Sequence, residues 1–376
     1  MLYLDHAATT HVRPEARSAM EPFYRDGFGN PSGLHGVSRQ AKNAMEEARE
    51  RAAELIGAER PLEIVFTGGG TEADNLAIVG ATLSVEHGRN GVVTVATEHE
   101  AVLESARFVE RFGVPVRVVG VDAEGLVTPS DVAAAVDETT RIVSVMSANN
   151  ETGVIQPIAE IVDAMPNGIL VHTDAVQAIV SEEVTAETTG ADLIAIASHK
   201  FGGPKGVGLL YVRNGIDLEP VIHGGGQELG RRSGTHNVAG IVGMVAAMEA
   251  TVADRSSFRS RVGEMRNAFE TALMSEIPDL QINAPSDRRL VQHSHVRIPG
   301  VSSETLLIRL DQAGVAAAAG SACHSGAIDV SHVLEAMGMD EAAAAQSVRF
   351  TFGWSTTLDE ALDAARIVNK VVAELR

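Results

Sequence analysis

Lysine is rare in this chain, and one lysine stands where an amine could do chemistry. The four lysines are Lys42, Lys200, Lys205 and Lys370. Two of them, Lys42 and Lys370, fall in helix-like patterns with charged neighbours, which is typical of solvated side chains. Lys200 comes just after the apolar, strand-like run at 193–197. Desolvation at a buried strand end lowers the pKa of an amine, which favours a Schiff base with an aldehyde.

Two further polar groups follow apolar runs. Asp174 closes the run at 169–173, where an unpaired carboxylate would be costly. A cationic partner would offset that cost, and Gln177 could add a hydrogen bond; Asp174 could equally cap the next helix. His99 follows the run at 92–96, and a histidine there is either functional or a hydrogen-bonded structural residue.

A glycine-rich segment supplies a third kind of group. The sequence TGGGTEADN at 67–75 follows the apolar run at 62–66 and opens a helical pattern. Glycines let the backbone approach an anion, and a helix N-terminus offers free N–H groups to a phosphate. The segment could also be a turn without a ligand, and it matches neither the dinucleotide nor the nucleoside triphosphate loop. Combined with a carboxylate for a ring nitrogen and a lysine for an aldehyde, it describes a pyridoxal phosphate site.

Composition narrows the class of protein. The formal net charge is −20 at pH 7, which disfavours nucleic acid and anionic membranes as partners. No run of about 18 apolar residues and no signal-peptide pattern occurs, so we expect a cytoplasmic protein without a membrane anchor. Cys323 is the single cysteine, which excludes an intramolecular disulfide and a cysteine-based zinc site. We expect no metal.

The alternation of elements indicates an α/β fold. Apolar runs at 62–66, 92–96, 116–121, 142–146, 169–173, 193–197 and 208–212 mostly alternate with helical patterns. This order predicts a large domain with a mostly parallel sheet sandwiched by helices, and ligands at the carboxyl ends of its strands. Residues 13–254 are expected to form it. Residues 255–376, with the N-terminal segment 1–12, are expected to form a smaller α+β domain that carries the cysteine.

Several motifs resemble one known family. They are YLDHAATT at 3–10, GNPS at 29–32 with His35, NNETGVIQP at 149–157, SHK at 198–200, RSGTHN at 232–237 and GSAC at 320–323. In this order they are similar to the cysteine desulfurases of the NifS/IscS type, among the class V aminotransferases, over nearly the whole chain. The resemblance implies a fold-type-I pyridoxal phosphate enzyme that is a homodimer.

The resemblance also implies roles for individual residues. Lys200 would bind the cofactor covalently, and Asp174 would pair with the pyridine nitrogen. His99 would stack on the ring and act in catalysis by moving protons. The remaining cofactor-binding candidates are Asn150 and Gln177 near the ring hydroxyl, and Gly70, Thr71, Ser198, His199 and the partner subunit's Thr235 near the phosphate. The family's serine usually stands one position before Ser198, where this chain has Ala197, which weakens that assignment.

Cys323 and Arg349 would act on the substrate. The resemblance implies that Arg349, with Asn150, binds the carboxylate of L-cysteine, since an arginine fork suits bidentate pairing. Lys200 would remove the α-proton and the Cys323 thiolate would attack the substrate sulfur, which leaves L-alanine and a persulfide on Cys323. A sulfur-acceptor protein, such as an iron–sulfur scaffold or a sulfur carrier, would then receive the sulfur.

Two rival readings remain at this stage. The chain could be a related lyase or aminotransferase acting on another substrate, such as selenocysteine, with the same cofactor. An aminotransferase has no need of Cys323, so the cysteine separates it from a desulfurase. The chain could also be a catalytically silent dimer, which would purify as a colourless protein.

Overall fold

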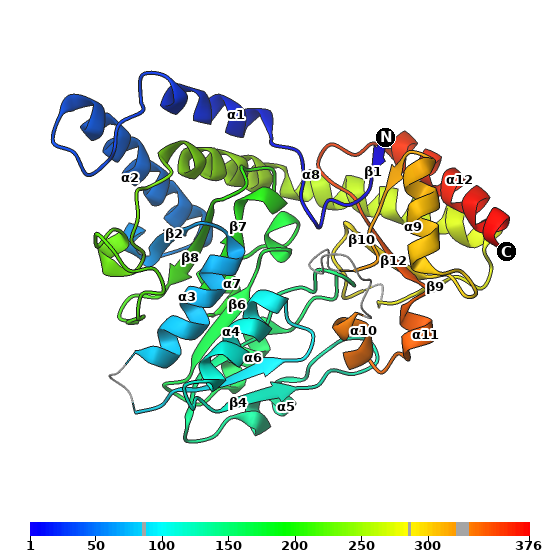
Figure 1. The fold of residues 1–376 in the computed structure, drawn as a ribbon, viewed down its shortest axis with the longest axis horizontal. Helices are drawn as coiled ribbons and strands as arrows, with labels where there is room; N and C mark the ends of the chain where they lie inside the picture. The colour runs from blue at the N-terminus through cyan, green and yellow to red at the C-terminus, as the bar shows by residue number, and fades with distance from the viewer. Residues whose placement is uncertain (85–87, 285–286, 321–330) are drawn as a thin grey trace.

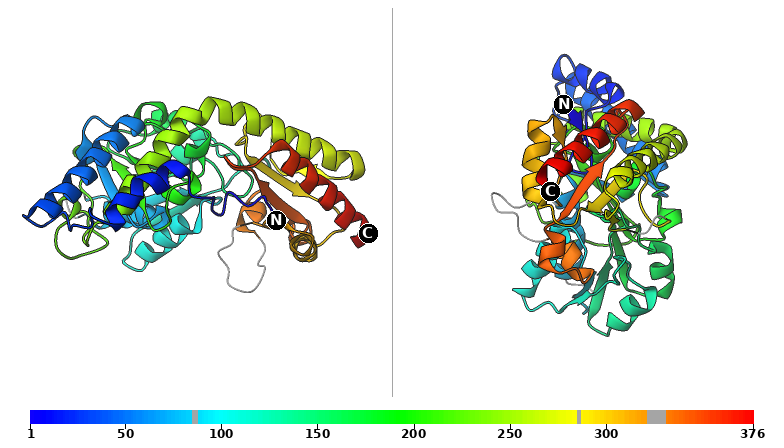
Figure 2. Two further views of the ribbon diagram at one scale, coloured as in Figure 1. Left: turned by 90° about the horizontal axis from the view of Figure 1, so that it is seen from above. Right: turned by 90° about the vertical axis from the view of Figure 1, so that its right-hand side faces the viewer.

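The computed structural model describes residues 1–84, 88–284, 287–320 and 331–376. Within them, the strands form a large sheet at one end of the molecule and a small sheet at the other, joined by one long helix (Figures 1 and 2). The strands are β1 (Leu2–Tyr3), β2 (Ile64–Thr67), β3 (Gly91–Val95), β4 (Val116–Val119), β5 (Thr140–Ser144), β6 (Leu170–Asp174), β7 (Leu193–Ala197), β8 (Gly208–Val212), β9 (Gln281–Ile282), β10 (His293–Arg297), β11 (Val315–Ala316) and β12 (Ser347–Thr351).

Helices surround both sheets. They are α1 (Pro14–Met20), α2 (Gly36–Ile56), α3 (Gly70–Leu83), α4 (Glu100–Glu110), α5 (Pro129–Ala135), α6 (Ile158–Ala164), α7 (Ala186–Thr189), α8 (Val238–Glu276), α9 (Ser303–Gln312), α10 (His332–Ala336), α11 (Glu341–Ala344) and α12 (Leu358–Leu375). No helix in the part of the chain that the structure describes combines the length and hydrophobicity of a transmembrane span.

The large sheet is mostly parallel, as predicted. Its described strands follow the order β2-β8-β7-β6-β5-β3-β4, and β8 runs antiparallel to both of its neighbours. Successive residues of a strand enter different cores because side chains alternate between the two faces. In β7, for example, Leu193 packs under α3, whereas Ile194 faces the core that α2 and α8 cover. The parallel strands of the large sheet bring the ends of β5, β6 and β7 to the same edge.

The small sheet is antiparallel and has its own core. Its described strands follow the order β12-β10-β9, and α9, α12 and the second half of α8 pack with them. Leu4 belongs to this core, and β1 pairs with β11, so the N-terminal segment is part of the small unit (Figure 1). Along α8, Met248 still packs in the large unit and Phe258 packs in the small one. The expected division at residue 255 falls between them and stays a prediction.

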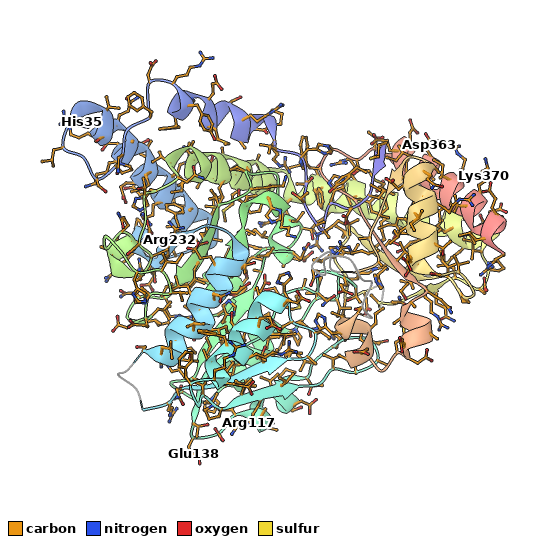
Figure 3. All side chains as sticks on the ribbon, viewed as in Figure 1. His35, Arg117, Glu138, Arg232, Asp363 and Lys370 are labelled. Atoms are coloured by element: carbon orange, nitrogen blue, oxygen red, sulfur yellow. The ribbon has the colours of Figure 1, made fainter. Side chains whose placement is uncertain are left out.

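A buried ion-pair network holds the segment that follows β8. Glu228 accepts hydrogen bonds from Arg49 on α2, at 2.7 and 2.8 Å, and from the Phe66 backbone at 3.1 Å. His236 lies 2.7 Å from the same carboxylate. Glu228 itself has a left-handed backbone with φ of 52°, a strained conformation that this network holds in place. Arg232, labelled in Figure 3, anchors the same segment to Glu72 at the start of α3.

We predict that Glu228→Gln destabilises the fold by about 2 kcal/mol at pH 7, because it leaves the buried Arg49 guanidinium with the partly exposed Glu46, 3.1 Å away, as its remaining counter-charge. Burial alone would raise the pKa of Glu228, but the hydrogen bonds from His236 and Arg49 prevail and lower it to about 2. A lowered carboxyl pKa contributes stability above the ordinary value of 4.5 that is lost as the pH falls towards 2. The difference from wild type should therefore shrink over that window.

Urea denaturation of both proteins between pH 7 and pH 3 measures this difference. The exposed Glu219→Gln is the matched control and should unfold like wild type. Equal unfolding free energies for Glu228→Gln and wild type at pH 7 would contradict the prediction.

Candidate active site

A cavity of about 280 Å³ opens at the carboxyl ends of the parallel strands. It is lined by Ala8, Gly70, Thr71, Asp74, His99, Met146, Asn150, Asp174, Val176, Gln177, Ala197, His199 and Lys200. The lysine and the aspartate predicted from the sequence therefore face one space. A second, more open cavity adjoins it and shares Thr71 and His199 with the first.

Lys200 is half-buried, whereas the other three lysines are exposed. It ends the short 3-10 helix Ser198–Lys200, which follows β7 directly. Its Nζ donates hydrogen bonds to the carbonyl oxygens of Ala7, at 2.6 Å, and Ala8, at 3.0 Å. The N-terminal segment therefore contributes Ala8 to the cavity wall and orients the amine. Lys370, by contrast, lies on the outer surface of α12 (Figure 3).

Asp174 is the last residue of β6 and is 6% exposed. Its Oδ1 accepts a hydrogen bond of 2.9 Å from the Val176 backbone N–H. Burial and the nearby Asp74 raise the pKa of Asp174 to about 6, although His99 opposes the shift. A cation in the cavity would stabilise the ionised form of a carboxyl group that is buried this deeply.

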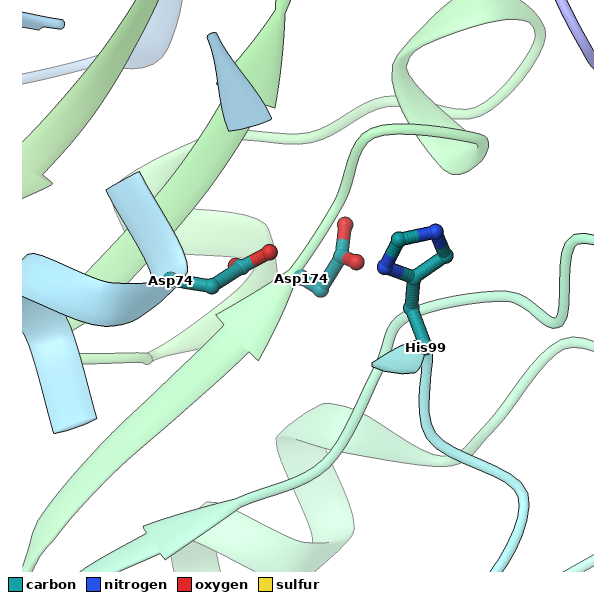
Figure 4. A group of neighbouring side chains, drawn as sticks. All are labelled: Asp74, His99 and Asp174. Carbon is teal, nitrogen blue, oxygen red and sulfur yellow. The ribbon is translucent and has the colours of Figure 1, made fainter. Parts of the chain in front are cut away.

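His99 forms the N-cap of α4, and its ring lies beside the Asp174 carboxylate (Figure 4). Its Nδ1 accepts a hydrogen bond from the Ala101 backbone N–H at 3.1 Å. In the neutral ring this bond places the proton on Nε2. Burial lowers the pKa of His99, with Asp174 opposing the shift, so the neutral form is favoured. The ring is thus held in one orientation and one tautomer.

The glycine-rich loop and His199 form the end of the site that suits an anion. Gly70 and Thr71 begin α3, whose first turn presents free backbone N–H groups. Lys205 lines the adjoining cavity together with Thr71. His199 lies 3.2 Å from the Thr9 hydroxyl, and burial, with Lys200 and Lys205 nearby, lowers its pKa to about 4. His199 is therefore neutral and can serve as a hydrogen-bond donor or acceptor.

Some sequence-predicted residues lie away from the cavity. Ser198 is fully buried against Gly203, and its Oγ has no hydrogen-bond partner among the described residues, so the structure does not place it beside a phosphate. Thr235 is exposed on the segment that follows β8. Arg349 is buried and is not among the residues that line the cavity. Cys323 lies outside the described residues.

Arg349 already holds a carboxylate. Its Nη1 donates to the Asn150 carbonyl oxygen at 2.7 Å, and its Nη2 contacts Asp5 Oδ1 at 2.8 Å. Asn150 and Gln177 do line the cavity, and Gln177 also donates to the Ala7 carbonyl at 3.0 Å. The guanidinium therefore does not line the cavity, but it contacts Asn150, which does. It also binds the Asp5 carboxylate, as it would have to bind the carboxylate of a substrate.

The sequence reasoning missed Asp74. This residue lies on the buried face of α3 between Ala73 and Ala77, and it contributes to the cavity wall. The available signal was a carboxylate at a position where the helical period requires an apolar residue.

Comparison with known proteins identifies the family. Residues 2–363 match the family described as Aminotransferase class-V. The chain belongs to the class-V aminotransferase family. It is 41% identical to "Cysteine desulfurase IscS" of Dictyoglomus turgidum, with 100% of this chain and 95% of that protein covered. It is 37% identical to "Cysteine desulfurase NifS" of Azotobacter vinelandii, with 100% and 93% covered.

Solved structures agree with the family assignment. A structure titled "NIFS-LIKE PROTEIN" superimposes with a TM-score of 0.92 at 35% identity and covers 99% of each chain. Another, titled "SspA in complex with cysteine", has a TM-score of 0.81 at 33% identity and covers 93% of this chain and 98% of that one. These matches confirm the predicted fold class, a mostly parallel sheet with helices on both faces.

Class-V aminotransferases are pyridoxal phosphate enzymes, and the cavity fits that cofactor. The fit rests on the buried Asp174, whose carboxylate would find a cationic partner in a protonated pyridine nitrogen. Lys200 supplies an amine to the same cavity for the aldehyde, and the start of α3 supplies N–H groups for the phosphate.

We predict that Gly70→Ala destabilises the protein by about 1–3 kcal/mol, because the added methyl group would overpack the start of α3. A Cβ at this position would lie 2.9 Å from Val176 Cγ2 and 3.2 Å from Ala197 Cβ. Chemical denaturation of the cofactor-free protein measures the loss. Gly120→Ala is the control, because a Cβ there meets nothing within 4 Å. Identical denaturation midpoints for the two variants would refute the predicted close packing.

Proposed function

We propose that this protein is a pyridoxal phosphate-dependent cysteine desulfurase that converts L-cysteine to L-alanine and leaves the sulfur as a persulfide on Cys323. The observation that carries the proposal is that Lys200 and Asp174 line one cavity at the strand ends. The relatives named cysteine desulfurase and the SspA structure with cysteine support the substrate.

The cofactor would be held at its two ends and across its ring. Lys200 Nζ would bind the aldehyde, and Asp174 would face the pyridine nitrogen, with His99 against the ring. Asn150 and Gln177 would lie near the ring hydroxyl, whereas the phosphate would be bound by the remaining candidates, Gly70, Thr71, His199 and the partner subunit's Thr235. Bound pyridoxal phosphate supplies an electron sink that stabilises negative charge on the α-carbon of an amino acid.

Lys200 is the residue placed to move the α-proton. With L-cysteine bound, Nζ would lie in the cavity beside the Ala7 and Ala8 carbonyl oxygens and would accept the α-proton as a general base. Asp174 would keep the ring nitrogen protonated through its negative charge. His99, neutral and fixed by its Nδ1 contact, would pack on the ring and could pass protons through Nε2.

The pairing of Arg349 with Asp5 supports its assignment to the substrate carboxylate. A guanidinium that binds one carboxylate at 2.8 Å has the geometry to bind another. Because Arg349 Nη1 also bonds to the Asn150 carbonyl, the substrate-binding residue is coupled to a residue of the cavity wall. Asn150 would thus serve both cofactor and substrate.

The described chain on either side of Cys323 approaches this same region. Ala318 pairs with Arg349 through backbone hydrogen bonds, and a Cβ on Gly320 would lie 3.0 Å from Glu151 Oε2. Ser331 donates a hydrogen bond to the same carboxylate from the other side of the segment. Both flanks therefore approach Glu151, the residue that follows Asn150, which supports a thiol that reaches the substrate sulfur.

A homodimer and a sulfur acceptor belong to the proposal. Large apolar side chains that would gain from a partner surface are exposed at Tyr24, Phe28, Leu34 and Leu229. Val221 and Ile222 line the open cavity beside Thr71, where the partner subunit's Thr235 would complete the phosphate site. The persulfide would pass its outer sulfur to an iron–sulfur scaffold or another sulfur carrier.

We infer a cytoplasmic location, where a single reactive thiol stays reduced.

We predict that the purified protein, incubated with pyridoxal phosphate, gains a chromophore that borohydride reduces onto the peptide containing Lys200. Lys200→Ala should release the cofactor on dialysis, because it removes the amine that binds the aldehyde. The exposed Lys42→Ala is the matched control and should label like wild type. Label on any other lysine, or none in wild type, would overturn the proposed cofactor site.

We predict that Cys323→Ala abolishes transfer of sulfur from L-cysteine but preserves the chromophore, because the thiolate is needed only to accept the sulfur. The measurement is alanine release together with labile sulfur bound to the protein. Cys323→Ser tests whether a hydroxyl of similar size can replace the thiol, and we expect that it cannot. Release of sulfide with pyruvate and ammonia by wild type would instead identify a β-eliminating lyase.

A further inference from the structure

Three carboxyl groups are buried around the ring end of the cavity. Asp74 on α3 is 1% exposed, Glu98 before α4 is 0% exposed, and Asp174 at the end of β6 is 6% exposed. Oxygen atoms of Asp74 and Asp174 and a ring nitrogen of His99 lie within 4.8 Å of one another (Figure 4). Carboxylates so close together and so far from water cannot all be ionised, so the site must hold protons on some of them.

Asp74 has the fewest groups that would stabilise a negative charge. Its Oδ1 has no hydrogen-bond partner among the described residues, and its closest basic atom is His172 Nε2 at 3.5 Å. That imidazole is fully buried, and its Nδ1 is bonded to the Ser144 hydroxyl at 2.8 Å. An ionised Asp74 would therefore be a buried charge whose nearby histidines, His172 and His99, are neutral, and which lies within 4.8 Å of the Asp174 carboxylate.

Asp174 is better placed to be ionised. It accepts the Val176 N–H, and it shares the cavity with His99 and Lys200. Glu98 accepts the Met146 N–H, but its Oε2 has no partner in the described part of the chain. Of the three carboxyl groups, Asp174 thus has the strongest reason to carry the negative charge.

We propose that Asp74 is a positioning residue that stays protonated in the working enzyme, and that its neutral state keeps the negative charge on Asp174 opposite the pyridine nitrogen of the cofactor. This inference rests on the proposed function for the presence of that nitrogen. Asp74 acts through Asp174, since a second negative charge beside Asp174 would favour protonation of both.

The titration of the surrounding groups agrees with this assignment. Burial raises the pKa of Asp74 to about 8, whereas that of Asp174 is raised to about 6. Burial also raises the pKa of Glu98 well above its ordinary value and lowers that of His172 to about 4. His99 is shifted downward as well. At pH 7 Asp74 and the two histidines are then neutral.

The raised pKa of Asp74 fixes the sign of a stability effect. A carboxyl group whose pKa is higher in the folded than in the unfolded protein costs stability as the pH rises from about 4 to about 8, because the unfolded chain releases its proton first. An amide at this position stays neutral in both states. Asp74→Asn should therefore be more stable than wild type at pH 8, and the two should converge as the pH falls towards 4.

The decisive measurement is isotope-edited infrared spectroscopy of the full-length protein, in which the spectrum with ¹³C-labelled aspartate is subtracted from the unlabelled one. It is recorded once with and once without pyridoxal phosphate. We expect a protonated-carboxyl band at pH 7 that disappears in Asp74→Asn and persists in the exposed control Asp163→Asn. If Asp74→Asn does not fold, Asp74→Ser serves in its place. A band that survives the substitution of Asp74, or no band in wild type, would overturn the proposal.

Two further readouts separate this inference from a merely structural role. In the holoenzyme, Asp74→Asn should extend the alkaline limb of kcat/KM to higher pH, because no charge can form at position 74. An unchanged alkaline limb would count against the proposal. If the protein fails to bind pyridoxal phosphate, the proposed function fails, yet the infrared band and the stability profile still test the protonation of Asp74.

Discussion

A buried carboxylate at the end of a parallel strand is the constraint on which the site depends. Asp174 has left water almost completely, and one backbone N–H is the hydrogen bond that the described structure gives its carboxylate. Such a group is tolerated when a cation shares its cavity, or when it gives up its charge. A cofactor with a protonated ring nitrogen supplies the cation. The neighbouring Asp74, if it stays protonated, keeps the negative charge on Asp174, where it can pair with that nitrogen.

The N-terminal segment joins the two units of the molecule across this cavity. Leu4 packs in the small core, Asp5 pairs with Arg349, and the Ala7 carbonyl accepts from Lys200. One short stretch, which turns at residues 6–8, therefore touches both the amine and the guanidinium assigned to cofactor and substrate. Because these contacts use main-chain carbonyls and one carboxylate, a shift of the small unit would also move the groups that hold the Lys200 amine. The position of α8, which enters both cores, limits such a shift.

Much of the site could be predicted because its residues follow apolar strands. The runs before Asp174 and Lys200 are buried on both faces, so their ends and the polar groups beyond them stand out in the sequence. Ser198 shows where this reasoning fails. The sequence predicts that Ser198 follows the end of a strand. It does not predict the direction of the side chain in the tight 3-10 turn, which is set by packing against Gly203. Asp74 was missed since its burial depends on α3 covering the sheet, and Arg349 was found by resemblance rather than by pattern.

The negative net charge of the protein does not prevent it from binding a cofactor that carries a phosphate. At physiological ionic strength, charges more than about 8 Å apart are largely screened, so most of the acidic surface has little influence on the cavity. Burial also leaves His199 neutral, which removes one cation from the phosphate end. Affinity for the anion must then come from short contacts, the N–H groups at the start of α3 and Lys205 beside them. Because these contacts have direction as well as charge, they set where the phosphate lies and, through it, how the ring meets Asp174.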